Sequence, residues 1–238
     1  MDEKRFNDLY NRSFSKGIKL FSDFLNLDEQ SILSATYLPC TVYGGYDGAE
    51  RVVAGFGEDI SEDDFPFVYI SVKPLSAKFS EKLTHRDYLG ALMNLGIKRE
   101  MLGDILISEN SACIICLDKI ADYVADNLTR IRHTSVKAVR TDSLPENTVK
   151  PPEPSELVVS SLRLDVLVCA VYKLSRKEGS KLFSAGKIFV NGRLTENPSY
   201  TVKEGDIISV RGTGRFAYDK PVRSTKKDRI VIEIRKYC

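Results

Sequence analysis

The pattern of hydrophobic and polar positions is clearest in the middle of the chain. Residues 67–72 form a β-branched and aromatic run that Pro74 closes, and this run predicts a strand. In the next segment, THRDYLGALMNLGI, Thr84 is a suitable N-cap with Asp87 three residues later, and apolar residues recur at helical spacing up to Gly96. This part of the chain therefore predicts a strand followed by an amphipathic helix.

Two short apolar runs and a second helical pattern follow. Residues 104–107 and 112–117 predict strands joined by the turn Glu109-Asn110-Ser111, residues 119–131 predict an amphipathic helix, and residues 136–139 predict a last strand. The order β-α-β-β-α-β is the ferredoxin-like plan that RNA-recognition-motif domains share. Those domains stack bases on aromatic residues of their two central strands, whereas the runs taken here as central, DILIS and ACIICL, are aliphatic. We therefore expect the architecture without base stacking.

The first 66 residues predict a small helical and hairpin region. Residues 5–14 and 16–26 have helical patterns, and residues 37–43 and 51–56 predict the two strands of a hairpin. The connecting segment GGYDGAER is rich in glycine, but it lacks the GxxxxGK[ST] spacing and the lysine of a phosphate-binding loop. Turn formation accounts for its glycines without a ligand.

A proline-rich segment separates the C-terminal third from the rest. Residues 143–156 read SLPENTVKPPEPSE, and because proline fixes φ and lacks an amide donor, this stretch should be extended and poorly paired. The chain is thus predicted to be α+β, with an N-terminal region at residues 1–66, a ferredoxin-like domain at 67–142, a linker at 143–155 and a C-terminal domain at 156–238.

The C-terminal domain begins with two helical patterns and continues with short strands. Ser160 or Ser161 is placed to cap the first helix, and Ser175 is placed to cap the second, which Gly186 ends. Asn191-Gly192 is a strong tight-turn signal. The predicted strands cover residues 188–190, 207–211 and 229–235.

Composition adds a charge asymmetry to this division. Of the 238 residues, 42% are hydrophobic and 29% charged, which excludes wholesale disorder. Residues 156–238 carry 17 Lys and Arg against 9 Asp and Glu, whereas residues 1–155 carry 18 against 24. A basic end on an acidic body indicates a polyanionic partner. No apolar run approaches the roughly 20 residues of a membrane span, and the N-terminus has no signal core, so we expect a cytoplasmic protein without membrane contacts.

Five cysteines and two histidines leave little room for metal or catalytic-triad chemistry. The odd number of cysteines, without a signal peptide, favours reduced thiols. Cys113 and Cys116 form a CxxC, but residues three apart in a strand face opposite sides, so both are predicted to be core thiols. We expect no metal, no cofactor and no small-molecule substrate.

The cations of the C-terminal domain gather at the ends of its predicted elements. Arg163 lies in the first turn of the first helix, Arg176 and Lys177 lie in the first turn of the second, and Arg215 falls beside a turn of the small sheet. Amides at a helix N-terminus carry partial positive charge, so a phosphate there gains backbone donors as well as guanidinium forks. The residues predicted to bind nucleic acid are Arg163, Ser175, Arg176, Lys177, Lys181, Lys187, Arg193 and Arg211.

The motifs of this domain resemble a known RNA-binding module. RLD, then SR about a dozen residues later, then GKIFVNGR, a PSY segment and KEGD match the S4 domain in order and spacing over roughly residues 156–215. The resemblance implies an αL-type fold. It also implies that Arg163 of RLD and Arg176 at the start of the second helix contact ribosomal or transfer RNA.

The whole chain resembles the YlmH family of bacterial RNA-binding proteins. The resemblance rests on GGYDGAER, on KFS followed by THRDYLGALMNLGIKRE and LGDI, and on the S4 motifs. It implies a non-enzymatic factor that binds ribosomal and transfer RNA on the large ribosomal subunit, beside peptidyl-tRNA, in ribosome-associated quality control. Two other functions stay open: an RNA-modifying enzyme that the S4 domain targets to its substrate, and a cell-division adaptor.

Overall fold

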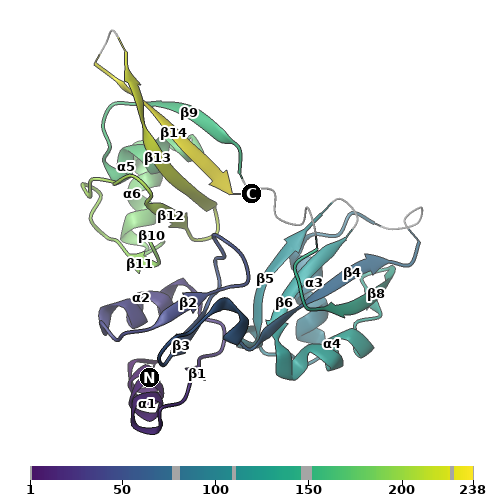
Figure 1. Ribbon diagram of the computed structural model, residues 1–238. Coiled ribbons are helices and arrows are strands. Elements are labelled where there is room, and N and C mark those ends of the chain that lie inside the picture. The colour runs from purple at the N-terminus through teal and green to yellow at the C-terminus, as the bar shows by residue number, and fades with distance from the viewer. Residues whose placement is uncertain (1, 77–80, 109–110, 146–151, 226–227, 238) are drawn as a thin grey trace. The chain divides into compact units, whose positions relative to one another are not determined.

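The computed structural model describes residues 2–76, 81–108, 111–145, 152–225 and 228–237 (Figure 1). The chain divides into two compact units, described separately here. The first comprises Met1–Glu29 with Thr36–Lys150, and the second comprises Gln30–Ala35 with Pro151–Cys238. Three predicted features lie wholly or partly outside the described residues: most of the proline-rich linker (146–151), part of a turn (109–110) and the KFS motif (78–80).

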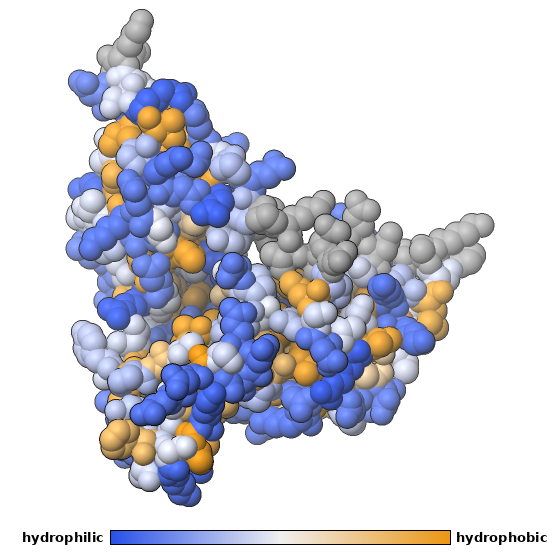
Figure 2. Space-filling view, in the orientation of Figure 1, coloured by the Kyte–Doolittle hydropathy of each residue, from blue (hydrophilic) through white to orange (hydrophobic). Residues whose placement is uncertain are grey.

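The apolar side chains of each unit are mainly internal. In the view of Figure 2 the visible surface is mostly hydrophilic, with small and scattered hydrophobic areas. Within the described part of the chain, no helix has the length and hydropathy that crossing a bilayer requires.

A five-stranded antiparallel sheet forms the middle domain of the first unit. Helices α3 (His85–Asn94) and α4 (Ala121–Asn127) pack on one of its faces. The strand order β5-β6-β4-β8, with the short β7 added beyond β8, belongs to the predicted βαββαβ plan, so the α+β fold class is confirmed. The strands are β4 (Phe67–Pro74), β5 (Leu102–Ile107), β6 (Ala112–Leu117), β7 (Arg130–Ile131) and β8 (Thr134–Thr141).

Capping starts α3 where the sequence predicted it. The amide and the hydroxyl of Thr84 both donate to Oδ2 of Asp87, at 2.8 and 2.7 Å, and the helix ends before Gly96, whose φ is +79°. In contrast, α4 is shorter than the predicted helix at 119–131. The chain leaves the helix after Asn127 and enters β7, which places the side chain of Ile131 in the core with no exposed surface.

The N-terminal region is a helix followed by a small sheet. α1 (Asp2–Lys16) extends the first predicted helix, and the predicted hairpin is confirmed by β2 (Thr41–Tyr43) and β3 (Val53–Phe56). The predicted helix at 16–26 is wrong. Gly17, with a φ of +60°, follows the end of α1, and β1 (Leu20–Phe21) pairs with β3 instead.

The hydrophobic pattern did not indicate helix α2 (Leu27–Ala35), because its apolar residues do not gather on one face. Its start is capped reciprocally. Oδ1 of Asn26 accepts the amides of Asp28 and Glu29 at 2.9 and 3.1 Å, and Oε2 of Glu29 accepts the amide of Asn26 at 2.7 Å. Asparagine followed three residues later by glutamate is a capping-box spacing, so the signal was present in the sequence.

The segment GGYDGAER folds as a turn that is tied to the middle sheet. A Cβ on Gly44 would lie 2.4 Å from the carbonyl oxygen of Arg51, so this position has no room for a side chain. The hydroxyl of Tyr46 donates to Asp104 at 2.7 Å, and the buried Arg51 donates from Nε to the carbonyl of Leu102 at 2.8 Å. The motifs GGYDGAER and LGDI therefore meet as one structural contact.

The face of the middle sheet opposite α3 and α4 is aromatic and covered. β4 and β6 are the central strands and β5 lies at the edge, so the choice of DILIS as a central strand was wrong. Phe67 of β4 packs against the rings of Phe24 and Tyr43, with centroids 5.6 and 5.8 Å apart, and Tyr69 donates to the carbonyl of Gly45 at 2.7 Å. Aromatic residues suited to base stacking are present on this face, but the N-terminal region packs over them, so that Tyr69 is buried and Phe67 is partly buried.

The two cysteines of the CxxC are core thiols, as predicted. Cys113 belongs to the aromatic cluster with Phe24 and Tyr69, whereas Cys116 belongs to the core beneath α3 and α4. They lie on opposite faces of β6 and cannot ligate one ion together. Burial raises the pKa of each thiol to about 12.

The second unit consists of two helices packed on a six-stranded antiparallel sheet of order β11-β10-β12-β13-β14-β9. The helices are α5 (Leu164–Tyr172) and α6 (Arg176–Ser184). The strands are β9 (Pro154–Val159), β10 (Ile188–Val190), β11 (Arg193–Leu194), β12 (Ile207–Val210), β13 (Gly214–Ser224) and β14 (Ile230–Tyr237).

Two predictions about the first residues of this unit were wrong. Residues 154–156 are not poorly paired linker, because they start β9, which pairs with β14 along its whole length. Proline is tolerated there because β9 is an edge strand and Pro154 is its first residue. The first helix is capped by Arg163 rather than by Ser160 or Ser161. The long strand β13 was not predicted.

Replacing Phe67 with Ala should lower the free energy of unfolding by about 2–4 kcal/mol, because it removes the centre of the aromatic cluster. Urea titration measures the change. Leu75→Ala is the matched control, since Leu75 is 68% exposed and should change stability by less than about 0.5 kcal/mol. If Phe67→Ala left the stability unchanged and lowered the affinity for RNA, the conclusion that the N-terminal region covers this face would be wrong.

Candidate nucleic-acid interface

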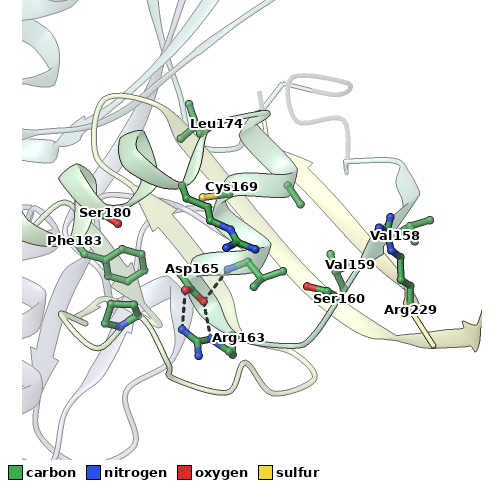
Figure 3. A pocket seen from close by; sticks show the side chains of 14 residues that line it. Val158, Val159, Ser160, Arg163, Asp165, Cys169, Leu174, Ser180, Phe183 and Arg229 are labelled. Atoms are coloured by element: carbon green, nitrogen blue, oxygen red, sulfur yellow. Dashed lines mark hydrogen bonds and ion pairs between the residues drawn. The ribbon is translucent and has the colours of Figure 1, made fainter. Parts of the chain in front are cut away.

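An open groove of about 770 Å³ lies at the starts of α5 and α6 and extends to β9 and the beginning of β14. We call it the arginine groove, because three guanidinium groups line it, those of Arg163, Arg176 and Arg229. Figure 3 shows Arg163 beside Asp165, with Ser160 between them and Arg229. All three arginines are exposed. The two arginines on which the sequence argument depended therefore share one groove.

Arg163 is held by the acidic residue of its own RLD motif. Its Nε and Nη2 donate to Oδ1 and Oδ2 of Asp165, at 3.0 and 2.8 Å, which makes a bidentate pair. About half of the Arg163 side chain, 49%, stays exposed. The pair therefore orients the guanidinium at the rim of the groove and leaves its remaining donors open to solvent.

The N-terminus of α5 does not offer its amides to a phosphate, contrary to the sequence argument. The amide of Leu164 donates to the carbonyl of Tyr200 at 2.9 Å, and that of Asp165 donates to the carbonyl of Pro198 at 3.1 Å. The loop that contains the PSY segment thus folds against the start of the helix and takes the first donors. Arg163 contributes to the groove through its side chain alone.

The N-terminus of α6 is closer to the predicted anion site. Ser175 caps it, with its hydroxyl donating to Glu178 Oε2 at 2.7 Å and accepting the Glu178 amide at 3.3 Å. Among the hydrogen bonds of the described residues, the amides of Arg176 and Lys177 have no acceptor. Because the proton of the Ser175 hydroxyl is already engaged, Ser175 positions Arg176 and does not donate to a phosphate in this geometry.

A close contact between the two helices brings their arginines to one groove. Gly179 of α6 is buried against α5, where a Cβ would lie 2.4 Å from Sγ of Cys169. A larger residue would force the helices apart or turn the thiol away. The sequence shows a glycine in the interior of the second helical pattern, which was a usable signal for close packing.

The remaining predicted cations lie outside the lining of the arginine groove. Lys177 and Lys181 are exposed on α6, one helical turn apart. Lys187 and Arg211 are neighbours, since the Arg211 amide donates to the Lys187 carbonyl at 2.9 Å. Arg193 lies on β11, and its guanidinium is hydrogen-bonded to Ser34, which belongs to the same unit.

The structure changes two assignments of basic residues. Arg215, predicted beside a turn, is buried, with its guanidinium 4.5 Å above the ring of Tyr237, so it is a packing residue. Arg229, not predicted as a site residue, lines the groove from the position just before β14. The sequence shows that the segment STKKDRI is basic, but only the structure shows that Arg229 lines the same groove as residues of α5.

Hydrogen bonding sets the charge of the two carboxylates at this interface. Pairing with Arg163 lowers the pKa of Asp165, and the same contact raises the pKa of Arg163. Hydrogen bonds from Ser175 lower the pKa of Glu178. Both acids are therefore ionised at neutral pH, and each balances part of the local positive charge.

Two family profiles match the chain. One, described as "Putative RNA-binding domain in YlmH", matches residues 61–144, and the other, described as "S4 domain", matches residues 162–208. The first span covers the middle domain, and the second begins just before Arg163, includes α5, α6, β10 and β11, and ends within β12.

Other proteins are similar to the chain over most of its length or over its S4 part. "Ribosome-associated protein quality control protein P2" of Bacillus subtilis is 37% identical over 220 residues, which cover 87% of this chain and 83% of that protein. "Small ribosomal subunit protein uS4A" of Clostridium acetobutylicum is 40% identical over 65 residues, 25% of this chain and 32% of that protein. The solved structure of "Cell division protein ylmH from Streptococcus pneumoniae" has 24% identity and a TM-score of 0.48 over 59% of this chain and 88% of that chain.

Replacing Arg163 with Gln should raise the pKa of Asp165 towards its ordinary value, because the bidentate pair is what lowers it. Carboxyl NMR titration measures this, and Glu178 serves as the internal control, since Ser175 lowers its pKa. A pKa lower in the folded chain than in the unfolded one stabilises the fold above about pH 4, and this stabilisation is lost as pH falls through the folded-state pKa. An unchanged Asp165 titration in Arg163→Gln would refute the pairing.

Replacing Gly179 with Ala should lower the free energy of unfolding by about 1–3 kcal/mol, because the added Cβ overlaps Sγ of Cys169. Adding Cys169→Ala removes the sulfur and should restore at least half of this loss. A double-mutant cycle followed by urea titration measures the coupling. Strictly additive effects of the two substitutions would show that the helices do not meet at this point.

Proposed function

Because the chain belongs to the YlmH family, we propose that it is a non-enzymatic RNA-binding factor that acts on the ribosome in protein quality control. Membership follows from its similarity to the Bacillus subtilis protein over most of both chains. The name of that relative supports the quality-control role, and the two matched domains support RNA as the partner.

The observation that carries the proposal is the arginine groove. Arg163 precedes α5, Arg176 begins α6 and Arg229 precedes β14, and all three line one open surface hollow. Guanidinium groups bind phosphate oxygens with two parallel donors each, and several of them around a concave surface match the spaced charges of a nucleic-acid backbone. Such contacts supply affinity and orientation but little sequence information. The chain therefore recognises its RNA by shape.

A structured RNA fits this mode of recognition best. Folded RNA presents its backbone at bends and across the shallow minor groove, where contacts to phosphates and 2′-hydroxyls depend on shape. Within the proposal the partners are ribosomal and transfer RNA on the large ribosomal subunit, beside peptidyl-tRNA, and the site of action is the cytoplasm. The similarity of the S4 part to a ribosomal protein supports ribosomal RNA as one of these partners.

The double variant Arg163→Gln, Arg176→Gln should lower the affinity for purified large ribosomal subunits by about tenfold or more and reduce the slope of log K against log salt concentration by about two. Co-sedimentation at several salt concentrations measures both. The matched control is Arg223→Gln, Arg235→Gln, which removes the same charge from arginines of the same unit that are paired with Glu156 and Asp219.

The proposal is overturned if the double variant and the control co-sediment equally. Arg229→Gln extends the test to the residue that only the structure placed in the groove, and it should weaken binding by a smaller factor because one phosphate contact is lost. Circular dichroism of each variant establishes that the fold is retained.

A further inference from the structure

A second basic groove lies on the helix side of the middle domain. It has a volume of about 500 Å³ and runs between α3 and the segment that links α4 to β7. We call it the helix-side groove. The residues used below line it: Arg86, Gly90, Asn94, Asn127, Arg130 and Arg132.

Positive charge predominates along this groove. Three arginines line it, with Asp87 as the acidic residue among the lining side chains. Arg132 lies 3.6 Å from Asp87 and 3.8 Å from Glu81, both longer than a good charged hydrogen bond. Arg130 donates from Nε to the carbonyl of Arg132 at 3.0 Å, which fixes its stem. Among the described contacts, the Arg86 guanidinium has no partner.

The floor of the groove is kept open by a glycine inside α3. A Cβ built on Gly90 meets no atom within 4 Å, so packing does not require glycine at this position. Glycine in a helix interior is less favourable than alanine, and its φ here is not one that only glycine adopts. Glycine at position 90 therefore lowers the stability of α3 without improving its packing. A ligand that approaches the backbone of α3 at this position would explain why no side chain is present.

The walls carry polar groups at fixed places. Tyr123 of α4 donates to the carbonyl of Leu95 at 3.2 Å, which links the two helices that border the groove. Asn127 donates from Nδ2 to the carbonyl of Tyr123 at 2.9 Å, so its Oδ1 remains as an acceptor. An amide oxygen beside arginines suits a ribose 2′-hydroxyl next to its phosphate.

We propose that the middle domain binds the sugar-phosphate backbone of RNA in the helix-side groove. Arg86 and Arg130 contact phosphates, Arg132 is positioned between Asp87 and the ligand, and Asn94 and Asn127 contact ribose hydroxyls. The inference rests on the proposed function for the identity of RNA as the ligand. It departs from the mode of other domains with this plan, which read RNA on the sheet face, because that face is buried here.

The test measures binding of the full-length chain to a fluorescein-labelled 20-base-pair RNA duplex by fluorescence anisotropy at several salt concentrations. Arg86→Gln, Arg130→Gln should weaken binding by about tenfold and reduce the salt slope by about two. The matched control is Lys73→Gln, Lys137→Gln, which removes the same charge from the sheet side of the same domain, where these two exposed residues pair across β4 and β8. The control should change affinity by less than about twofold.

A steric variant tests the same groove without changing charge. Gly90→Ala should weaken RNA binding and Gly90→Leu should weaken it further, because each added side chain occupies the floor of the groove, and both variants should melt at or above the temperature of the unaltered chain because α3 gains helix propensity. Equal binding by the arginine variant and the lysine control overturns the proposal, as does unaltered binding by Gly90→Leu or no binding of the duplex by the unaltered chain. All these variants retain Arg163 and Arg176, so equal binding by the arginine variant and the lysine control counts against the helix-side groove alone, whereas the arginine groove is tested by co-sedimentation with ribosomal subunits.

Discussion

Burial of the aromatic face of the middle sheet decides which surfaces of the first unit remain for RNA. Phe67 and Tyr69 lie on the central strand β4, where domains of this plan present rings to bases, but the rings of Phe24 and Tyr43 cover them. The covering segment is held in place by the contact of Tyr46 with Asp104 and by the buried Arg51. Opening this face would expose a large apolar cluster and break these bonds, so the fold favours recognition by cations over recognition by stacking.

In the C-terminal unit, the packing of helices and strands brings the arginines together in one groove. Its arginines belong to separate elements, and they converge because Gly179 allows α6 to approach α5 and because β9 pairs with β14. Each of these contacts is apolar or purely backbone, so the placement of the helices and strands that carry the arginines does not depend on charge. Ionic strength therefore changes the strength of RNA binding without changing the shape of the groove.

Local signals predicted much of this arrangement, and long-range contacts account for what they missed. The capping pair Thr84 and Asp87 and the apolar runs that became β4 and β6 helped to predict the ferredoxin-like plan. The sequence did not predict which strands pair with one another. Pro154 was assigned to the linker although it pairs with β14, and β5 was predicted to be a central strand although it lies at the edge of its sheet. For the interface, the sequence identified Arg163 and Arg176 as cations at helix starts. It could not show that the Pro198–Tyr200 loop occupies the amides of α5, or that Arg229 faces the groove and Arg215 does not.

Each groove has one arginine beside a carboxylate and others without an acidic partner among the described contacts. Asp165 holds Arg163 through two hydrogen bonds, and Asp87 lies near Arg132, whereas in the described contacts the guanidinium groups of Arg176, Arg229 and Arg86 have no acidic partner. A held guanidinium loses little conformational entropy on binding and sets the orientation of the ligand. An unheld one loses more, but it adapts to a phosphate whose position varies. Because folded RNA repeats its backbone chemistry and varies its shape, a combination of both kinds supports recognition by shape across related sites.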